Sequence, residues 1–150
     1  MDETLSRAVA ELEREGRFAQ LKNYRQHGSS TVYDHSLNVA RTALRVARRI
    51  PLKVDEAALV RGALLHDYFL YDWHVPDRAR PNHALYHPRM AWENAGRDYD
   101  LGRTEADIIR RHMFPVVPIP PRTLEGWIVC AVDKACAVQE TLFAGAKKKR

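Results

Sequence analysis

The sequence predicts an all-α fold, a single-domain bundle of about six helices. Apolar residues recur at the three- and four-residue spacing of amphipathic helices along most of the chain, and no long stretch alternates with a period of two. Capping residues and prolines divide this pattern into segments. A chain of 150 residues suits one domain with one hydrophobic core, and the sequence contains no internal repeat or low-complexity linker.

The helices are expected at residues 2–20, 34–50, 55–68, 88–98, 104–113 and 123–143. The second follows a loop at Gly28–Ser30, is capped by Asp34 and ends before Pro51. Pro88 occupies a favoured first position of the fourth helix. The connection from Phe69 to Tyr86 is long for a helical bundle, and connections of this length commonly act as lids or binding loops.

Composition and charge narrow the class of protein. A hydrophobic content of 45% and a charged content of 29% are ordinary for a soluble globular domain. No apolar run is long enough for a bilayer, and the acidic N-terminal segment does not resemble a signal peptide. We therefore expect a cytoplasmic protein without membrane contact, in which Cys130 and Cys136 are buried free thiols.

The net charge of +5 does not indicate a nucleic-acid partner. Residues 147–150 supply four of these charges, which leaves +1 for residues 1–146. Residues 1–146 are expected to form the domain, and residues 147–150 a solvated basic C-terminal tail. The sequence leaves the oligomeric state open, and a homo-oligomer is compatible with it.

The third predicted helix is apolar on almost every side, with only Arg61 as an interruption. A helix of this kind lies in the interior of a protein. It ends in His66 and Asp67, two polar groups that need partners if they are buried.

The sixth predicted helix has the same character. From Trp127 to Val138 its only charged residues are Asp133 and Lys134. Lys134 points about 100° away from Asp133 around the helix, so it is a poor direct partner for this carboxylate.

Two further histidines face the predicted core. His35 lies at the edge of an apolar arc that includes Val39 and Ala43, and His112 shares its side of the fifth helix with Ile108. One inward histidine is more often a hydrogen-bonded core residue than a ligand. Inward polar groups on four separate helices favour a shared cation, and imidazole with carboxylate suits zinc, iron or manganese.

In this ordered set of residues the chain resembles the HD superfamily of metal-dependent phosphohydrolases. The shared pattern is a histidine on one helix, a His–Asp doublet at the end of a buried helix, and an aspartate on a late helix. Its members here lie in the segments YDHSLNVA, GALLHDYF and IVCAVDKACA. The resemblance covers roughly residues 25–140 and implies an HD-domain-like helical fold.

The resemblance also implies a set of metal ligands. His35, His66, Asp67 and Asp133 would hold a first divalent transition metal (Fe, Mn, Zn, Co or Ni). Families with two metals add two histidines between the doublet and the last aspartate, and His87 and His112 fall in that interval, in the segments YHPRMAWENA and IIRRHMFP. Asp67 would then bridge the two metals. His74 and His83 lie in the same region as His87 and are alternatives to it.

The implied reaction is attack of a metal-activated water on a phosphoester or phosphoanhydride of a small phosphorylated compound, with a nucleotide as one candidate. Further candidate catalytic residues are Asp72, to orient water or protonate the leaving group, and Lys134, to contact phosphate. Candidate substrate-binding residues are Arg25, His27 and Arg89. The alternatives are an exposed loop carboxylate for Asp72, a surface ammonium for Lys134 and a loop-capping role for His27.

The absence of other motifs limits the enzyme classes that the sequence can represent. No Gly-x-Ser-x-Gly elbow, Walker loop or Gly-rich nucleotide fingerprint occurs in the sequence. The segment HDYFLYDWH lacks the Gly–Lys pair of HD-type cyclic dinucleotide phosphodiesterases. Two alternatives share the ligand set: a di-iron oxygenase of the HD fold, and a non-catalytic binding domain stabilised by metal.

Overall fold

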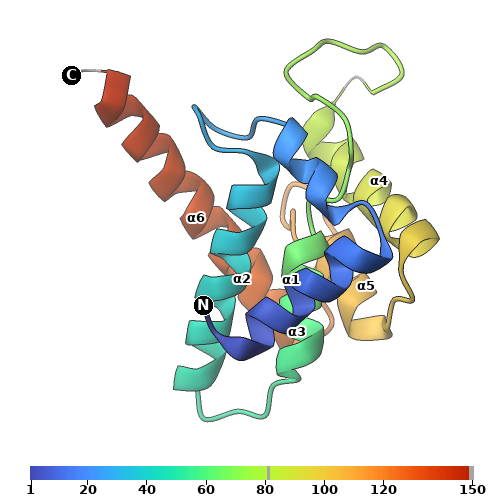
Figure 1. Ribbon diagram of the computed structural model, residues 1–150, viewed down its shortest axis with the longest axis vertical. Helices are drawn as coiled ribbons and strands as arrows, with labels where there is room; N and C mark the ends of the chain where they lie inside the picture. The colour runs from blue at the N-terminus through green and yellow to red at the C-terminus, as the bar shows by residue number, and fades with distance from the viewer. Residues whose placement is uncertain (81, 149–150) are drawn as a thin grey trace.

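The computed structural model describes residues 1–80 and 82–148, and over these residues the chain is a bundle of helices without strands (Figure 1). The elements are α1 (Glu3–Glu15), the 3₁₀ helix η1 (Phe18–Asn23), α2 (Val32–Arg49), α3 (Glu56–Leu65), α4 (His83–Asp98), α5 (Arg103–Arg111) and α6 (Leu124–Lys148). The all-α, single-domain prediction is confirmed.

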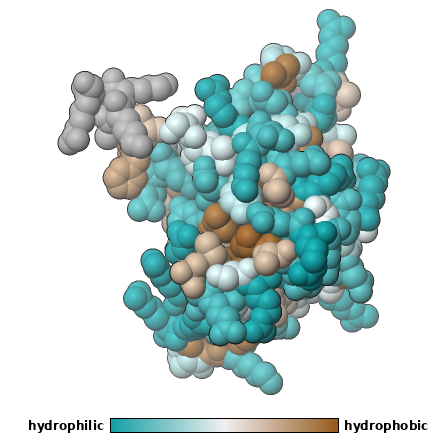
Figure 2. Space-filling view, viewed as in Figure 1, coloured by the Kyte–Doolittle hydropathy of each residue, from teal (hydrophilic) through white to brown (hydrophobic). Residues whose placement is uncertain are grey.

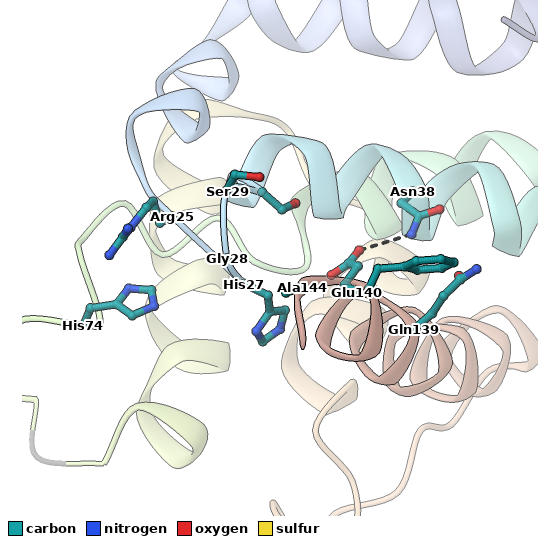
Figure 3. A pocket seen from close by; sticks show the side chains of 11 residues that line it. Arg25, His27, Gly28, Ser29, Asn38, His74, Gln139, Glu140 and Ala144 are labelled. Carbon is teal, nitrogen blue, oxygen red and sulfur yellow. Dashed lines mark hydrogen bonds between the residues drawn. The ribbon is translucent and has the colours of Figure 1, made fainter. Parts of the chain in front are cut away.

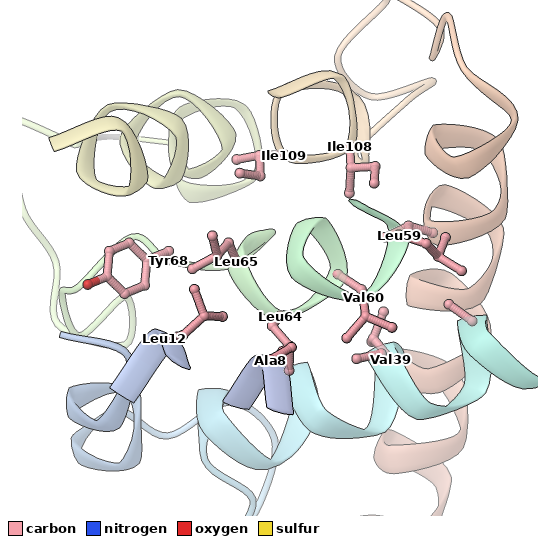
Figure 4. Close-up of a cluster of buried hydrophobic side chains, with 14 of the residues drawn as sticks. Ala8, Leu12, Val39, Leu59, Val60, Leu64, Leu65, Tyr68, Ile108 and Ile109 are labelled. Carbon is pink, nitrogen blue, oxygen red and sulfur yellow. The ribbon is translucent and has the colours of Figure 1, made fainter. Parts of the chain in front are cut away.

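Helix α3 lies at the centre of the bundle and packs against α1, α2, α5 and α6. Buried aliphatic side chains from four helices meet around it (Figure 4): Ala8 and Leu12 of α1, Val39 of α2, Leu59, Val60, Leu64 and Leu65 of α3, and Ile108 and Ile109 of α5. This position follows from a sequence that is apolar around the whole helix. It also places the end of α3, where His66 and Asp67 stand, inside the protein.

The first two helices begin or end at residues other than those predicted. α1 ends at Glu15 rather than near residue 20, because the chain turns at Gly16 and continues as η1. The N-cap of α2 is Thr31 and not Asp34. Thr31 Oγ1 accepts from the backbone N–H of Asp34, and the Asp34 carboxylate accepts from the backbone N–H of Thr31, which is a capping box.

Helices α4 and α6 are longer than predicted, whereas α5 ends two residues earlier, at Arg111. α4 begins at His83, so Pro88 lies inside the helix instead of at its first position. Because proline has no N–H, it leaves one backbone carbonyl of the preceding turn without its helical partner. α6 continues past residue 143 to Lys148, so it includes the first part of the predicted basic tail. Residues 149 and 150 lie outside the described residues.

The hydrophilic surface is the one expected from a charged content of 29%. The face in Figure 2 is largely hydrophilic, with apolar side chains gathered in a small area near its centre. Cys130 and Cys136 are buried and free, as predicted. Within the described part of the chain, no helix is long and apolar enough to cross a membrane.

The packing of α3 against α5 generates a stability prediction. A Cβ atom added at Gly62 would clash with Ile108 Cδ1 and lie 3.0 Å from Ile108 Cβ, so Gly62→Ala overpacks this interface. We expect the substitution to lower the free energy of unfolding by about 1–3 kcal/mol, measured by urea denaturation. The control is Gly96→Ala on the exposed side of α4, where nothing lies within 4 Å of the new Cβ. There we expect no loss and a gain of up to about 1 kcal/mol, and equal effects at both sites would contradict the prediction.

Candidate metal centre

Six buried histidine and aspartate side chains meet where the ends of several helices converge. They form two groups within which one ligand atom per residue lies within 4.8 Å of the others. The first group is His35, His66, Asp67 and Asp133, and the second is Asp67, His87 and His112. The residues come from α2, the end of α3, α4, the end of α5 and α6. The structure thus brings together all six residues of the predicted ligand set.

The first group is centred on Asp133. Its Oδ1 atom lies 2.8 Å from Nε2 of His35 and 3.1 Å from Nε2 of His66. Oδ2 of Asp67 closes the group, at 3.3 Å from Nε2 of His66 and 3.6 Å from Nε2 of His35. Two carboxylates therefore face the same two imidazole nitrogens.

The second group uses the other oxygen of Asp67. Its Oδ1 atom lies 3.2 Å from Nε2 of His87 and 3.4 Å from Nε2 of His112. Because Oδ2 faces the first group and Oδ1 the second, the Asp67 carboxylate stands between them, with one oxygen directed to each.

Three of the four histidines are oriented by backbone carbonyls that accept a hydrogen bond from Nδ1, the ring nitrogen that points away from the cluster. Nδ1 of His66 lies 2.6 Å from the carbonyl oxygen of Ala63, and Nδ1 of His112 lies 2.8 Å from that of Ile109. His66 and His112 follow the last turns of α3 and α5, where helical carbonyls lack an intrahelical donor. Nδ1 of His87 likewise lies 2.7 Å from the carbonyl oxygen of its own helix, at His83.

A carbonyl oxygen only accepts, so Nδ1 of each of these rings must carry the proton. In the neutral ring the lone pair is then on Nε2, which points into the cluster. Nε2 of His87 and Nε2 of His112 lie only 2.9 Å apart, so two lone pairs face each other unless a proton or a metal ion lies between them. This donor set, of imidazole Nε2 and carboxylate oxygen, fits a divalent transition metal in each group.

The charges of the cluster shift its pKa values. Burial lowers the pKa of His35, but hydrogen bonds to Asp133 and Glu140 outweigh burial and raise it to about 9. Burial also opposes the charged form of His66, yet the charges of Asp67 and Asp133 raise its pKa well above the ordinary value. For His112 burial dominates, and the pKa is lowered.

The two carboxylates respond in the opposite direction. Burial raises the pKa of Asp67, but the charge of His66 and the contacts of the carboxylate with His112, His66 and His87 outweigh burial and hold this pKa well below its usual range. The pKa of Asp133 is also lowered despite its burial, because His66 and His35 lie against it. Without metal, protons on the imidazoles balance the buried carboxylates.

Two of the predicted substrate-binding residues lie in a cavity beside the first group. Arg25 and His27 line a cavity of about 1020 Å³ together with His74, Asn38 and Glu140. In Figure 3, Arg25 and His74 stand at one end of the cavity and Asn38 at the other, with His27 between them. The His27 ring lies 6.3 Å from the His35 ring, measured between centroids, so the cavity borders the cluster.

Three other predicted residues are directed elsewhere. Arg89 follows His87 by two positions, about 200° around α4, and its side chain is 75% exposed and paired with Glu93 at 3.0 Å. Asp72 is exposed and accepts from the backbone N–H of His74 at 3.0 Å. Lys134 Nζ donates to the carbonyl oxygen of His112 at 2.9 Å, where it ties α6 to the end of α5. The structure does not bring these three side chains to the cluster.

The sequence analysis missed two polar side chains that contact the cluster. Gln26 Nε2 donates to Oδ2 of Asp67 at 3.2 Å, and nothing in its loop sequence signals this role. The Glu140 carboxylate accepts from Nδ1 of His35. A signal for Glu140 did exist, because it lies seven residues after Asp133 and seven residues return to nearly the same side of a helix.

Aromatic rings hold the long connection against the second group. The rings of Trp73 and His83 are stacked at 4.9 Å between centroids, and those of His83 and His87 at 4.4 Å. Burial and the charge of His87 lower the pKa of His83 to about 3, so His83 is neutral, and its Nδ1 is hydrogen-bonded to the Tyr71 hydroxyl at 2.8 Å. The connection between α3 and α4 is thus packed onto His87.

Comparison with protein families agrees with this geometry. The model of the HD domain matches residues 32–137, a segment that contains all six residues of the cluster. Comparisons with curated proteins and with solved structures give no match. Because the matched segment covers more than half of the sequence, the chain belongs to the HD-domain superfamily of metal-dependent phosphohydrolases.

Proposed function

We propose that the protein is a phosphohydrolase that uses two divalent metal ions to cleave a phosphoester or phosphoanhydride bond of a small phosphorylated compound. The observation that carries the proposal is the position of Asp67, which directs one carboxylate oxygen to each of two histidine groups. A carboxylate between two adjacent metal sites is the arrangement required to hold two ions close enough to act on one phosphoryl group. Family membership supports the same reaction class.

The residues of the cluster would have the following roles in the reaction. Bound divalent ions would supply a water of lowered pKa and stabilise negative charge on the phosphoryl oxygens. The first ion would be held by His35, His66, Asp67 and Asp133, and the second by Asp67, His87 and His112. Gln26 fixes the Asp67 carboxylate through its hydrogen bond to Oδ2.

The cavity beside the first group is the proposed substrate site. Arg25 offers a positive charge and hydrogen-bond donors to phosphate oxygens, and the imidazole rings of His27 and His74 lie in the same cavity. A volume of about 1020 Å³ accommodates a small phosphorylated compound, including a nucleotide. We assign no role in the reaction to Asp72, Lys134 or Arg89, because their contacts are made elsewhere.

The first prediction concerns activity. Protein loaded with manganese or cobalt is expected to release phosphate from members of a nucleotide and phosphoester panel. Asp67→Ala is expected to lose bound metal and to fall to the background rate, because it removes the carboxylate common to both groups. Arg89→Ala is the control and should retain both properties. Normal metal content in Asp67→Ala would refute the ligand assignment, and dioxygen consumption by iron-loaded protein without phosphate release would indicate an oxygenase instead.

The second prediction separates the two metal sites. His112→Ala removes a ligand of the second group and leaves the four residues of the first group unchanged. The metal content, measured by elemental analysis after removal of excess ion, is expected to fall from about two ions per chain to about one. An unchanged content in this variant would mean that His112 is not a ligand of a second ion.

The third prediction concerns pH. The pKa of His35 is raised to about 9 in the metal-free protein, so its ring is protonated at pH 7.5, and a metal ion must displace that proton. Metal affinity should therefore fall as the pH is lowered from about 9. Calorimetry at pH 7.5 in buffers of different ionisation enthalpy should detect proton release on metal binding. Binding without proton release at this pH would be inconsistent with His35 as a ligand.

A further inference from the structure

We propose that Glu140 is a positioning residue for the first metal site, where it fixes the orientation and the tautomer of His35. This inference rests on the proposed function, because it assumes that His35 binds a metal ion through Nε2. Both oxygens of the Glu140 carboxylate lie close to Nδ1 of His35, at 2.8 Å and 3.0 Å. The contact joins α2 to the outer part of α6, across 105 positions of the sequence.

His35 is distinguished from the other three histidines by this partner. Nδ1 of His66, His87 and His112 each faces a backbone carbonyl of the same helical segment, three or four residues earlier. For His35, in the first turns of α2, Nδ1 has no such backbone carbonyl among its hydrogen-bond partners. A side chain from another helix takes their place, and that side chain carries a negative charge.

One helix thereby holds both nitrogens of the His35 ring. Asp133 of α6 lies 2.8 Å from Nε2, and Glu140 of the same helix lies 2.8 Å from Nδ1. The seven-residue spacing puts the two carboxylates on one side of α6, about two turns apart. Asn38, one turn after His35 in α2, donates to Glu140 at 3.1 Å and holds it in place.

The charge of Glu140 has a consequence for the metal. A carboxylate that accepts the Nδ1 proton of a ligating histidine increases the basicity of Nε2 and restricts rotation of the ring. Among the described residues only the first group has such a support, and it contains two carboxylates, Asp133 and the shared Asp67, whereas the second group contains the shared Asp67 alone. Removal of the Glu140 charge is therefore expected to weaken the first metal site more than the second.

The experiment compares Glu140→Gln and Glu140→Ala with the wild-type protein. The metal-free proteins are titrated with Zn²⁺ against a chelator of known affinity. Both variants are expected to bind the tighter ion about 10- to 100-fold more weakly. Glu140→Gln keeps nearly the shape of the side chain, so it reports the loss of charge even if Glu140→Ala folds poorly.

Two further measurements separate positioning from a general structural effect. In the zinc-loaded wild-type protein, ¹⁵N-edited NMR should show His35 with a slowly exchanging proton on Nδ1, and this signal should be lost in Glu140→Ala. Gln139→Ala is the matched control: Gln139 precedes Glu140 and lines the same cavity, and its removal should leave zinc affinity and the His35 signal unchanged.

The outcomes distinguish this inference from the proposed function. If both Glu140 variants bind zinc as tightly as the wild type while His35→Ala binds it weakly, the positioning role is refuted and the metal site stands. If His35→Ala also binds zinc with wild-type affinity, the metal-site assignment fails and the role of Glu140 fails with it. An equal loss of affinity in Gln139→Ala would likewise overturn the role of Glu140.

Discussion

The structure depends on the neutralisation of two carboxylates, Asp67 and Asp133, that are buried in an otherwise apolar helical core. An unpaired carboxylate in such a core costs several kcal/mol, and paired charges must be held in good geometry to offset this cost. In the metal-free protein, protonated His35 and His66 meet this requirement, and the same cluster directs imidazole nitrogens to the proposed metal ions. Protons and the proposed metal ions compete for the same Nε2 atoms, so the buried negative charge would be balanced in the metal-free and in the metal-bound protein.

The ends of the helices provide the geometry. His66 and His112 stand at the C-terminal ends of α3 and α5, and each uses a carbonyl of the last turn to orient its ring. The His–Asp doublet is effective at that position because α3 is buried, so that the turn after it opens inside the protein. The same hydrogen bonds therefore satisfy carbonyls at the helix ends and orient the two imidazole rings toward the cluster.

Features set by local periodicity could be predicted from the sequence. The all-apolar character of α3 indicated its burial, and the inward faces of His35 and His112 indicated that both belong to a buried polar cluster. Features set by contacts between distant segments could not be predicted in this way. The hydrogen bond of Gln26 to Asp67 depends on how the loop before α2 approaches the end of α3, and the packing of Trp73 on His83 depends on how the α3–α4 connection folds onto α4.

The prediction for Lys134 shows a different limit. The helical wheel correctly turned Lys134 away from Asp133, but it gave no information on which backbone carbonyl its flexible side chain would reach. Arg89 and Asp72 were selected for proximity in sequence to candidate ligands. Two positions along a helix reverse the direction of a side chain, and five positions along a loop can lead to the surface. The direction in which a side chain leaves its helix thus predicts its contacts better than its distance along the sequence from a candidate ligand.

The location of His66 and His112 at helix ends has a consequence for the lifetime of the protein. Helix ends fray before helix centres, and each fraying event briefly exposes backbone to proteases. The proposed metal ions would link five helices, α2 to α6. One helix end could then not open without breaking metal coordination, so the helix ends would open together. Under the same proposal, the metal-free protein would be cleaved by added protease faster than the metal-loaded protein.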